Sequence, residues 1–205
     1  MSEPTFDLLF PTPVMRTNID RVFSQEELAC AEKHLKGALR NESNLTSANN
    51  YIFNEPEFLE LKNTATKYIN YYINRVHKPK NAVDIFITQS WLNWTSKGEY
   101  HHKHDHPNSF ISGVMYIQTD PFKDQITFYK SGYSFIDLDA TSYDIFNCHD
   151  CHLTVKSGDI VLFPSYLSHN VNQICSDKTR ISLAFNTFIR GTFGNNQNLK
   201  EVKNA

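Results

Sequence analysis

The spacing of apolar residues changes near Lys80, and this change constrains the fold more than any other feature of the sequence. Six segments after it have the length and composition of β-strands, and turn signals such as Ser96-Lys97-Gly98 separate them. They span residues 83–94, 109–117, 125–129, 152–155, 159–163 and 180–188. Because no helical pattern lies between these segments, they predict a sandwich, barrel or jelly roll.

Two helices are predicted before the strands. Ser24 and Glu27 form a capping-box pattern, and apolar residues at helical spacing extend this helix to near Arg40. A second helix is expected from about Pro56 to His77, with the proline in its first turn. We therefore expect an α+β fold in which two N-terminal helices brace a β core.

The length of 205 residues fits one domain, expected over residues 1–190, with helices in about 24–77 and the β core in about 83–188. Residues 191–205 are rich in Asn and Lys and predict a flexible tail.

With 20 Lys plus Arg against 22 Asp plus Glu, the net charge of −2 argues against a general nucleic-acid binder. The sequence shows neither a signal peptide nor an apolar run long enough for a membrane span, so we expect a cytoplasmic protein with no membrane partner.

Histidines are concentrated in the β half of the chain. Seven of the nine lie within residues 101–169, and four of them crowd into residues 101–106. Side chains two residues apart share a face of an extended segment, so His102, His104 and His106 are expected to point the same way. Two imidazoles at this spacing can bind one metal ion, and the alternative is an exposed polar loop.

A third metal ligand must come from elsewhere in the chain. His169 is the best candidate, because it follows a buried strand and a tight turn at residues 159–168. Pro107 favours an extended backbone at His106. Without a metal, His169 would be a core histidine near a strand end.

The last predicted strand carries a charge in an unusual place. Alternation puts Arg180 and Ser182 on one face and Ile181 and Leu183 on the other. An arginine on the inner face of a core strand is costly unless an anion pairs with it. Arg180 and Ser182 could together hold a carboxylate, with the guanidinium as a bidentate fork. The alternative is an arginine at the start of a strand that reaches solvent.

The order of these elements resembles the iron(II)- and 2-oxoglutarate-dependent oxygenases. The order is His-x-His, a histidine about 65 residues later, and Arg-x-Ser eleven residues after that. Residues 98–109, 112–116, 163–165 and 180–186, with the opening 9–14, resemble a family of small 2OG-Fe(II) oxygenases within this superfamily. The resemblance spans most of residues 6–188 and implies a double-stranded β-helix, which is a jelly roll of the cupin type.

The resemblance also implies an activity and its groups. Iron(II) would be held by His104, His106 and His169. The far carboxylate of the cosubstrate 2-oxoglutarate would bind Arg180 and Ser182. The protein would then hydroxylate a small molecule or a peptidyl residue with O2, giving succinate and CO2 as co-products.

Three further residues are candidates for supporting roles. Tyr116 could donate a hydrogen bond to the cosubstrate, and Asn93 and Asn186 face inward by register and could support the site. Each of the three could equally cap a strand or satisfy a buried backbone group.

The sequence departs from the larger superfamily at one ligand. Most members use His-x-Asp or His-x-Glu with a distal histidine, whereas here the second position is His106 and Asp105 points to the opposite face. Three neutral ligands leave a bound metal more positive. A pair shifted by one step, His102 with His104, is also chemically feasible, but the family pattern places its pair immediately before the proline.

Two alternatives belong to other functional classes. One is a non-oxidative cupin-type metal-binding protein, either an isomerase or a small-molecule sensor, which would have no need of Arg180-x-Ser182. The other is a structural β-sandwich with incidental histidines.

The segment 148–152 contains C-x-x-C-H, which is typical of haem attachment and of half a zinc site. Haem attachment requires export and a zinc site requires four ligands, so we interpret this segment as a polar loop.

Overall fold

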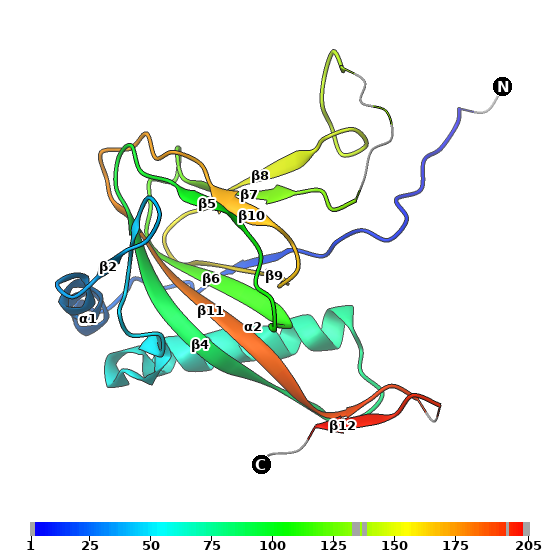
Figure 1. Ribbon diagram of the computed structural model, residues 1–205, viewed down its shortest axis with the longest axis horizontal. Helices are drawn as coiled ribbons and strands as arrows, with labels where there is room; N and C mark the ends of the chain where they lie inside the picture. Colours follow the sequence, from blue (N-terminus) through cyan, green and yellow to red (C-terminus); the bar gives the residue numbers. More distant parts are fainter. Residues whose placement is uncertain (1–2, 133–135, 137–138, 196, 203–205) are drawn as a thin grey trace.

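Two antiparallel sheets face each other in the computed structural model, which describes residues 3–132, 136, 139–195 and 197–202 (Figure 1). The larger sheet has the strand order β1-β9-β6-β11-β4-β3-β2, and β12 pairs with β11. Its strands are β1 (Met15–Asn18), β2 (Leu39–Arg40), β3 (Leu45–Thr46), β4 (Val83–Thr95), β6 (Ile111–Gln118), β9 (Asp159–Pro164), β11 (Arg180–Phe193) and β12 (Lys200–Val202). The smaller sheet has the order β5-β10-β7-β8. Its strands are β5 (His101–His104), β7 (Gln125–Tyr129), β8 (Asp150–Thr154) and β10 (His169–Val171).

Each of the six segments predicted as strands contains one: β4, β6, β7, β8, β9 and β11. The short strands β1, β2, β3, β5, β10 and β12 are not among the predicted segments. They have two to four residues each, so their extended form depends on hydrogen bonds to a distant partner rather than on local pattern.

The first helix, α1 (Gln25–Leu35), begins as its capping signal predicts. The amide of Glu27 donates to Ser24 Oγ at 3.2 Å, and the amide of Ser24 donates to Glu27 Oε2 at 2.7 Å. The prediction that this helix extends to near Arg40 is wrong. It ends at Leu35, and Leu39–Arg40 forms β2, which pairs with β3. Cross-strand pairing therefore overrides the apolar spacing at Leu39.

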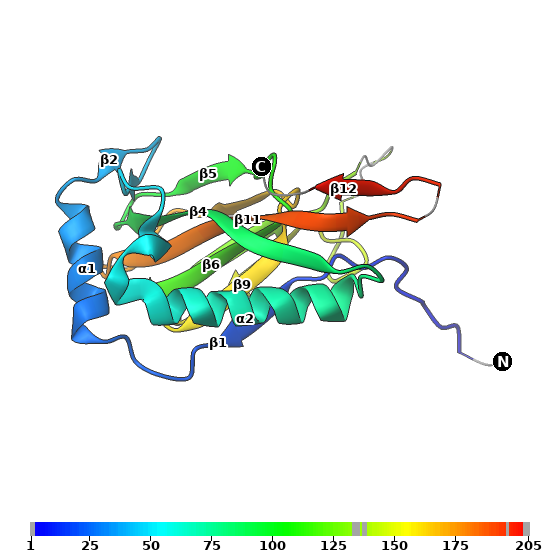
Figure 2. The same cartoon turned by 90° about the horizontal axis from the view of Figure 1, so that it is seen from below.

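The second helix, α2 (Leu59–Val76), lies along the outer face of the larger sheet (Figure 2). Two short 3-10 turns lead into it, η1 (Ile52–Asn54) and η2 (Pro56–Phe58). Its apolar side, with Leu61, Ala65 and Ile69, belongs to one core with Leu183 and Phe185 of β11. No helix in the described part of the chain is long and apolar enough to cross a membrane.

A second core fills the space between the two sheets. It joins Tyr116, Phe163 and Ala184 of the larger sheet to Ile126 and Phe128 of the smaller one. β11 thus contributes alternate residues to two different cores, because successive side chains of a strand point to opposite faces.

The C-terminal segment differs from the predicted flexible tail. β11 continues to Phe193, and β12 returns beside it, with Gly191 opposite Val202. The turn between them includes Gly194 at a φ of 84°, a conformation that favours glycine. Composition alone suggested a tail because the pairing that orders these residues lies in another strand. Residues 196 and 203–205 of the predicted tail lie outside the described residues.

Candidate metal centre

Three histidines converge where the smaller sheet meets the loop after β5. β10 pairs with β5 so that His169 lies opposite His104, and His106 follows two residues beyond the end of β5. One ligand atom from each of the three lies within 4.8 Å of the others. The ring centroids are 4.4 Å apart for His104 and His169, 5.0 Å for His104 and His106, and 5.2 Å for His106 and His169. The structure therefore brings together the three residues proposed as metal ligands.

Backbone contacts orient two of these rings. The Nδ1 atom of His104 lies 2.8 Å from the carbonyl oxygen of His102, and Nδ1 of His169 lies 3.0 Å from that of Leu167. A carbonyl only accepts, so Nδ1 carries the proton in each ring and donates it. The Nε2 atoms then carry the lone pairs, which is the tautomer that a metal ligand needs.

Burial keeps all three imidazoles uncharged. It lowers the pKa of His169 to about 3 and that of His106 to about 4, and the neighbouring histidines lower both further. The pKa of His104 is also lowered, mainly by burial and against the opposing effect of its hydrogen bond to His102. Neutral imidazoles are the form that binds a metal ion, so at neutral pH these groups need lose no proton to do so.

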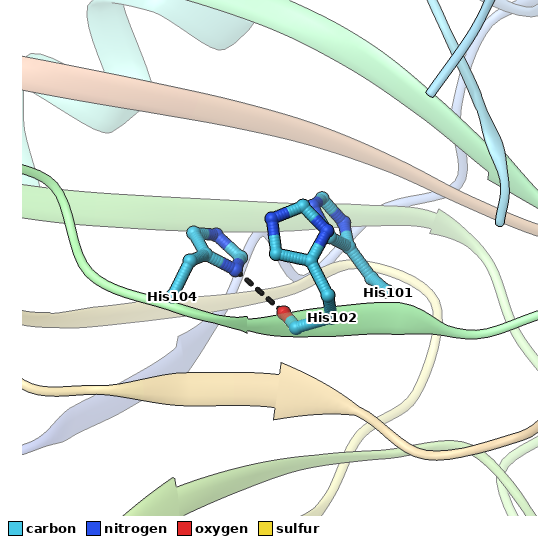
Figure 3. A group of neighbouring side chains, drawn as sticks. All are labelled: His101, His102 and His104. Atoms are coloured by element: carbon cyan, nitrogen blue, oxygen red, sulfur yellow. Dashed lines mark hydrogen bonds between the residues drawn. The ribbon is translucent and has the colours of Figure 1, made fainter. Parts of the chain in front are cut away.

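A fourth imidazole, His101, lies beside His104, and Figure 3 shows these two residues together with His102. The pairing of β5 with β10 is irregular between His101 and His104, so strict alternation of side chains does not hold there. The ring of His101 stacks on that of His104 at 4.6 Å, and burial is the main cause that lowers its pKa to about 3. Alternation therefore missed His101, and only the bulge in the strand reveals it.

His102 lies at the rim of this cluster. Its Nδ1 atom is 3.1 Å from Glu42 Oε2, and about a third of its side chain is exposed. His101, His102 and His104 also form a group whose ligand atoms lie within 4.8 Å of one another. This group shares His104 with the first and adds His101, which the sequence did not suggest. The choice between His102 and His106 as the partner of His104, which the sequence left open, therefore persists in the geometry.

Arg180 is buried on the inner face of β11 with no anion beside it. The residue is 2% exposed, and its Nε atom has no hydrogen-bond partner. No carboxylate among the described residues lies within ion-pair distance of it. The charge of Arg180 is felt by Asp124, a buried carboxyl. Burial raises the pKa of Asp124, and Arg180 partly opposes this rise. Arg180 also contributes to the lowered pKa of His169 and His101, so its charge is close to the imidazoles.

Other unpartnered polar atoms surround Arg180. The guanidinium carbon lies 5.0 Å from the ring centre of Tyr116, whose hydroxyl is buried without a hydrogen-bond partner. The side-chain oxygen of Asn93 is also buried without a hydrogen-bond partner. Ser182 is buried directly opposite both Asn93 and Tyr116 in the register of the sheet. Buried polar groups are nearly always hydrogen-bonded, so this set indicates a place for a polar ligand.

Asn186 has a different environment from the other predicted site residues. Its side-chain oxygen accepts from Ser112 Oγ at 2.7 Å, and Ser112 contacts Ser165 Oγ at 2.9 Å. The Ser165 carbonyl in turn accepts from the amide of His106 at 2.9 Å. Asn186 therefore belongs to a buried network that reaches the loop carrying His106.

The surface beside His106 is hollowed. A cleft of about 400 Å³ is lined by residues of α2, of the loop after β5 and of the segment after β9, and His106 forms part of its wall. Asp105 also lines this cleft and is not part of either histidine group. A molecule in this cleft would contact the proposed metal site from the side of His106.

The cysteine-rich segment takes no part in the centre. Cys148 and Cys151 are free thiols, and Cys151 is exposed on β8. His152 Nδ1 contacts Thr127 Oγ1 at 2.8 Å rather than a cysteine.

Residues 89–186, which contain all the site residues named above, match a family model described as "Putative 2OG-Fe(II) oxygenase". The match covers just under half of the chain and shows that this β core is similar to those oxygenases. A search of curated proteins finds no match to the chain.

Solved structures share the fold of this chain at low sequence identity. A prolyl-4-hydroxylase from Pseudomonas putida has a TM-score of 0.54 at 13% identity, over 86% of this chain and 92% of that one. HygX from Streptomyces hygroscopicus, solved with nickel, 2-oxoglutarate and hygromycin B, has a TM-score of 0.58 at 12% identity, over 86% and 82%. SnoN, an α-ketoglutarate-dependent epimerase from nogalamycin biosynthesis, has a TM-score of 0.63 at 11% identity, over 86% and 78%. At these identities the likeness concerns the fold, which is a jelly roll.

Proposed function

We propose that this chain, whose β core matches a 2OG-Fe(II) oxygenase family, is an iron(II)- and 2-oxoglutarate-dependent dioxygenase that hydroxylates a primary substrate. The observation that carries the proposal is the buried guanidinium of Arg180, whose Nε atom has no hydrogen-bond partner and which forms no ion pair among the described residues. It lies on the same side of the larger sheet as three converging imidazoles. Two features that fit one small diacid and one metal ion therefore occur together.

The three imidazoles fit a divalent transition metal. His104, His106 and His169 would hold iron(II) through nitrogen atoms, a common ligand type for this ion. Iron(II) bound there supplies the activation of O2, coupled to the oxidative decarboxylation of 2-oxoglutarate to succinate and CO2. The backbone carbonyls of His102 and Leu167 fix two of the rings by accepting from their Nδ1 atoms.

The environment of Arg180 fits the far carboxylate of 2-oxoglutarate. A guanidinium can donate two parallel hydrogen bonds to a carboxylate, and the burial here removes competing water. Ser182 and Tyr116 lie on the same face and each offers a hydroxyl for the same group. The Tyr116 hydroxyl remains a donor, because burial raises its pKa above the ordinary value. Asn93 lies beside them, opposite Ser182 in the register of the sheet.

The primary substrate would enter through the cleft beside His106. The serine and asparagine network behind His106 holds the loop in place from the inner side, while the cleft leaves the outer side open. Relatives in fold include a prolyl hydroxylase and a protein that binds hygromycin B, so a peptidyl residue and a small molecule are both within the class we propose.

The non-oxidative alternative does not explain Arg180. A cupin-type isomerase or sensor without 2-oxoglutarate would leave a buried cation facing no anion, at a cost of several kcal/mol. The oxygenase proposal assigns an anion to it. The fold is compatible with more than one outcome at the substrate, since SnoN shares it and is an epimerase. Among these outcomes we propose hydroxylation.

Turnover of the cosubstrate tests the proposal without knowledge of the primary substrate. Because the proposed reaction requires all three, we expect succinate to form only with iron(II), 2-oxoglutarate and O2 together. His104→Ala should abolish this turnover. Arg190→Lys is the matched control, because Arg190 lies at the other end of β11 in an exposed pair with Asp84. Turnover unaffected by His104→Ala, or absent under all conditions in a folded protein that binds iron, would contradict the proposal.

A further inference from the structure

A second group of metal-ligating side chains lies away from the histidine centre, between α1 and the turn before η2. Cys30 and His34 are one helical turn apart on α1, and Glu55 precedes η2. The Cys30 thiol, a His34 ring nitrogen and a Glu55 carboxylate oxygen lie within 4.8 Å of one another. None of the three belongs to the groups that contain His104.

Of these side chains, His34 is the one whose ring nitrogen lacks a hydrogen bond. His34 Nε2 lies 3.3 Å from Glu55 Oε1, yet this nitrogen is buried and has no hydrogen bond. Glu55 is held from other directions, since Oε1 accepts from Asn49 at 3.1 Å and Oε2 from Lys33 at 3.4 Å. The His34 nitrogen and the Glu55 oxygen thus form a 3.3 Å ion pair without a hydrogen bond, and the Cys30 thiol lies within 4.8 Å of both.

We propose that Cys30, His34 and Glu55 bind a zinc ion. Sulfur, imidazole nitrogen and carboxylate oxygen are the three ligand types of protein zinc sites, and three protein ligands leave one tetrahedral position for water. A thiolate and a carboxylate carry two negative charges, which balance the charge of the ion. The i, i+4 spacing on α1 places the first two ligands on one helix face.

Burial of the cluster makes the Cys30 thiol harder to deprotonate. It is the largest cause that raises the pKa of the Cys30 thiol to about 11, followed by the carboxylates of Glu57 and Glu55. The thiol therefore keeps its proton until a cation displaces it, and zinc binding releases that proton. Cys30 is 2% exposed, whereas the side chains of His34 and Glu55 are 15% and 19% exposed and leave a route for the ion.

The remaining charged neighbour is Lys33. Its ammonium group pairs with Glu55, but 66% of this side chain is exposed, so it can turn into solvent when a cation binds. The segment that carries Glu55 is anchored from the other side, because the amide of Phe53 in η1 donates to Ser90 Oγ at 2.9 Å. Zinc would therefore join α1 to a segment already fixed on β4.

Cobalt(II) is the probe, because a cobalt–thiolate bond gives a charge-transfer absorption that the three-histidine centre cannot produce. The full chain carries Cys148→Ser, Cys151→Ser and Cys175→Ser, so that Cys30 is its one thiol. We expect the intensity of this band to saturate when each chain holds one thiolate-bound cobalt ion. Added zinc should displace that cobalt and abolish the band. No thiolate band in this folded variant would overturn the proposal.

Ligand variants then assign the site. In the same background, His34→Gln and Glu55→Gln should each weaken the cobalt–thiolate complex at least tenfold, although Cys30 remains. Glu32→Gln is the charge-matched control on the same helix and should leave the affinity unchanged. His104→Ala should also leave the band unchanged, which separates this site from the histidine centre. Equal affinity in His34→Gln, Glu55→Gln and the control would show that the cluster is not the site.

Discussion

The two faces of β11 differ in the chemistry of their buried side chains, which is apolar on the outer face and polar on the inner face. On the outer face, Leu183 and Phe185 are fully buried against the helical layer. On the inner face, Arg180 and Ser182 are also buried, but toward a space where several polar atoms have no partner. The strand is equally inaccessible on both sides, so burial alone does not distinguish them. The outer face supplies the stability that allows the inner face to keep unpaired polar groups for a ligand.

The largest effect on stability is expected on the outer face, from Phe185→Ala. The ring of Phe185 fits against Gly113, where a Cβ atom would collide with both Phe185 and Leu162. Removing a large ring from such a packed site costs about 3–5 kcal/mol of unfolding free energy. Denaturant unfolding monitored by circular dichroism measures it. A loss below about 1 kcal/mol would mean that the two faces do not divide their roles as described.

The next effect is expected on metal binding, from His169→Ala. This change removes one of three proposed ligands, so it should reduce iron(II) affinity by more than the roughly 10–100-fold typical when a hydrogen-bond partner of a ligand is lost. The β-sheet circular dichroism should persist. Metal analysis of the purified variant measures occupancy, and full occupancy would show that the assignment of His169 is wrong.

A smaller effect is expected on cosubstrate binding, from Arg180→Lys. Lysine keeps the charge but not the planar fork, so one charge-assisted hydrogen bond to 2-oxoglutarate is lost. The expected cost is about 1.5–3 kcal/mol, on the order of ten- to a hundredfold in affinity. Anaerobic titration calorimetry on metal-loaded protein measures it, with Arg190→Lys as the control on the same strand. If both variants bind equally well, Arg180 does not contact the cosubstrate.

The smallest effect is expected from His101→Phe, which sharpens the choice between the two histidine groups. Phenylalanine preserves the aromatic stack on His104 and removes both ring nitrogens. If the ligands are His104, His106 and His169, iron(II) affinity should change by less than the roughly 10–100-fold that follows loss of a ligand's hydrogen-bond partner, because His101 stacks on His104 without a hydrogen bond to it. A loss as large as that of His169→Ala would instead assign the metal to the group that contains His101 and His102.

Local signals in the sequence predicted what depends on neighbours in the chain. The capping box at Ser24 and Glu27 sets the start of α1 through contacts three residues apart, and alternation placed Arg180 and Ser182 on the inner face. What could not be predicted depends on distant partners. The end of α1, the hairpin of β12 and the bulge that turns His101 inward are all set by cross-strand pairing. The group formed by Cys30, His34 and Glu55 was missed because no single segment contains it.

The central claim is that one metal ion and one 2-oxoglutarate bind together on the inner face of β11. A crystal structure of the protein prepared anaerobically with iron(II) and 2-oxoglutarate tests it most directly, with anomalous scattering to locate the iron. We predict iron bound to the Nε2 atoms of His104 and His169 and to a ring nitrogen of His106, with the far carboxylate of 2-oxoglutarate against Arg180. Iron held by His101 and His102, or a cosubstrate that does not contact Arg180, would contradict the account.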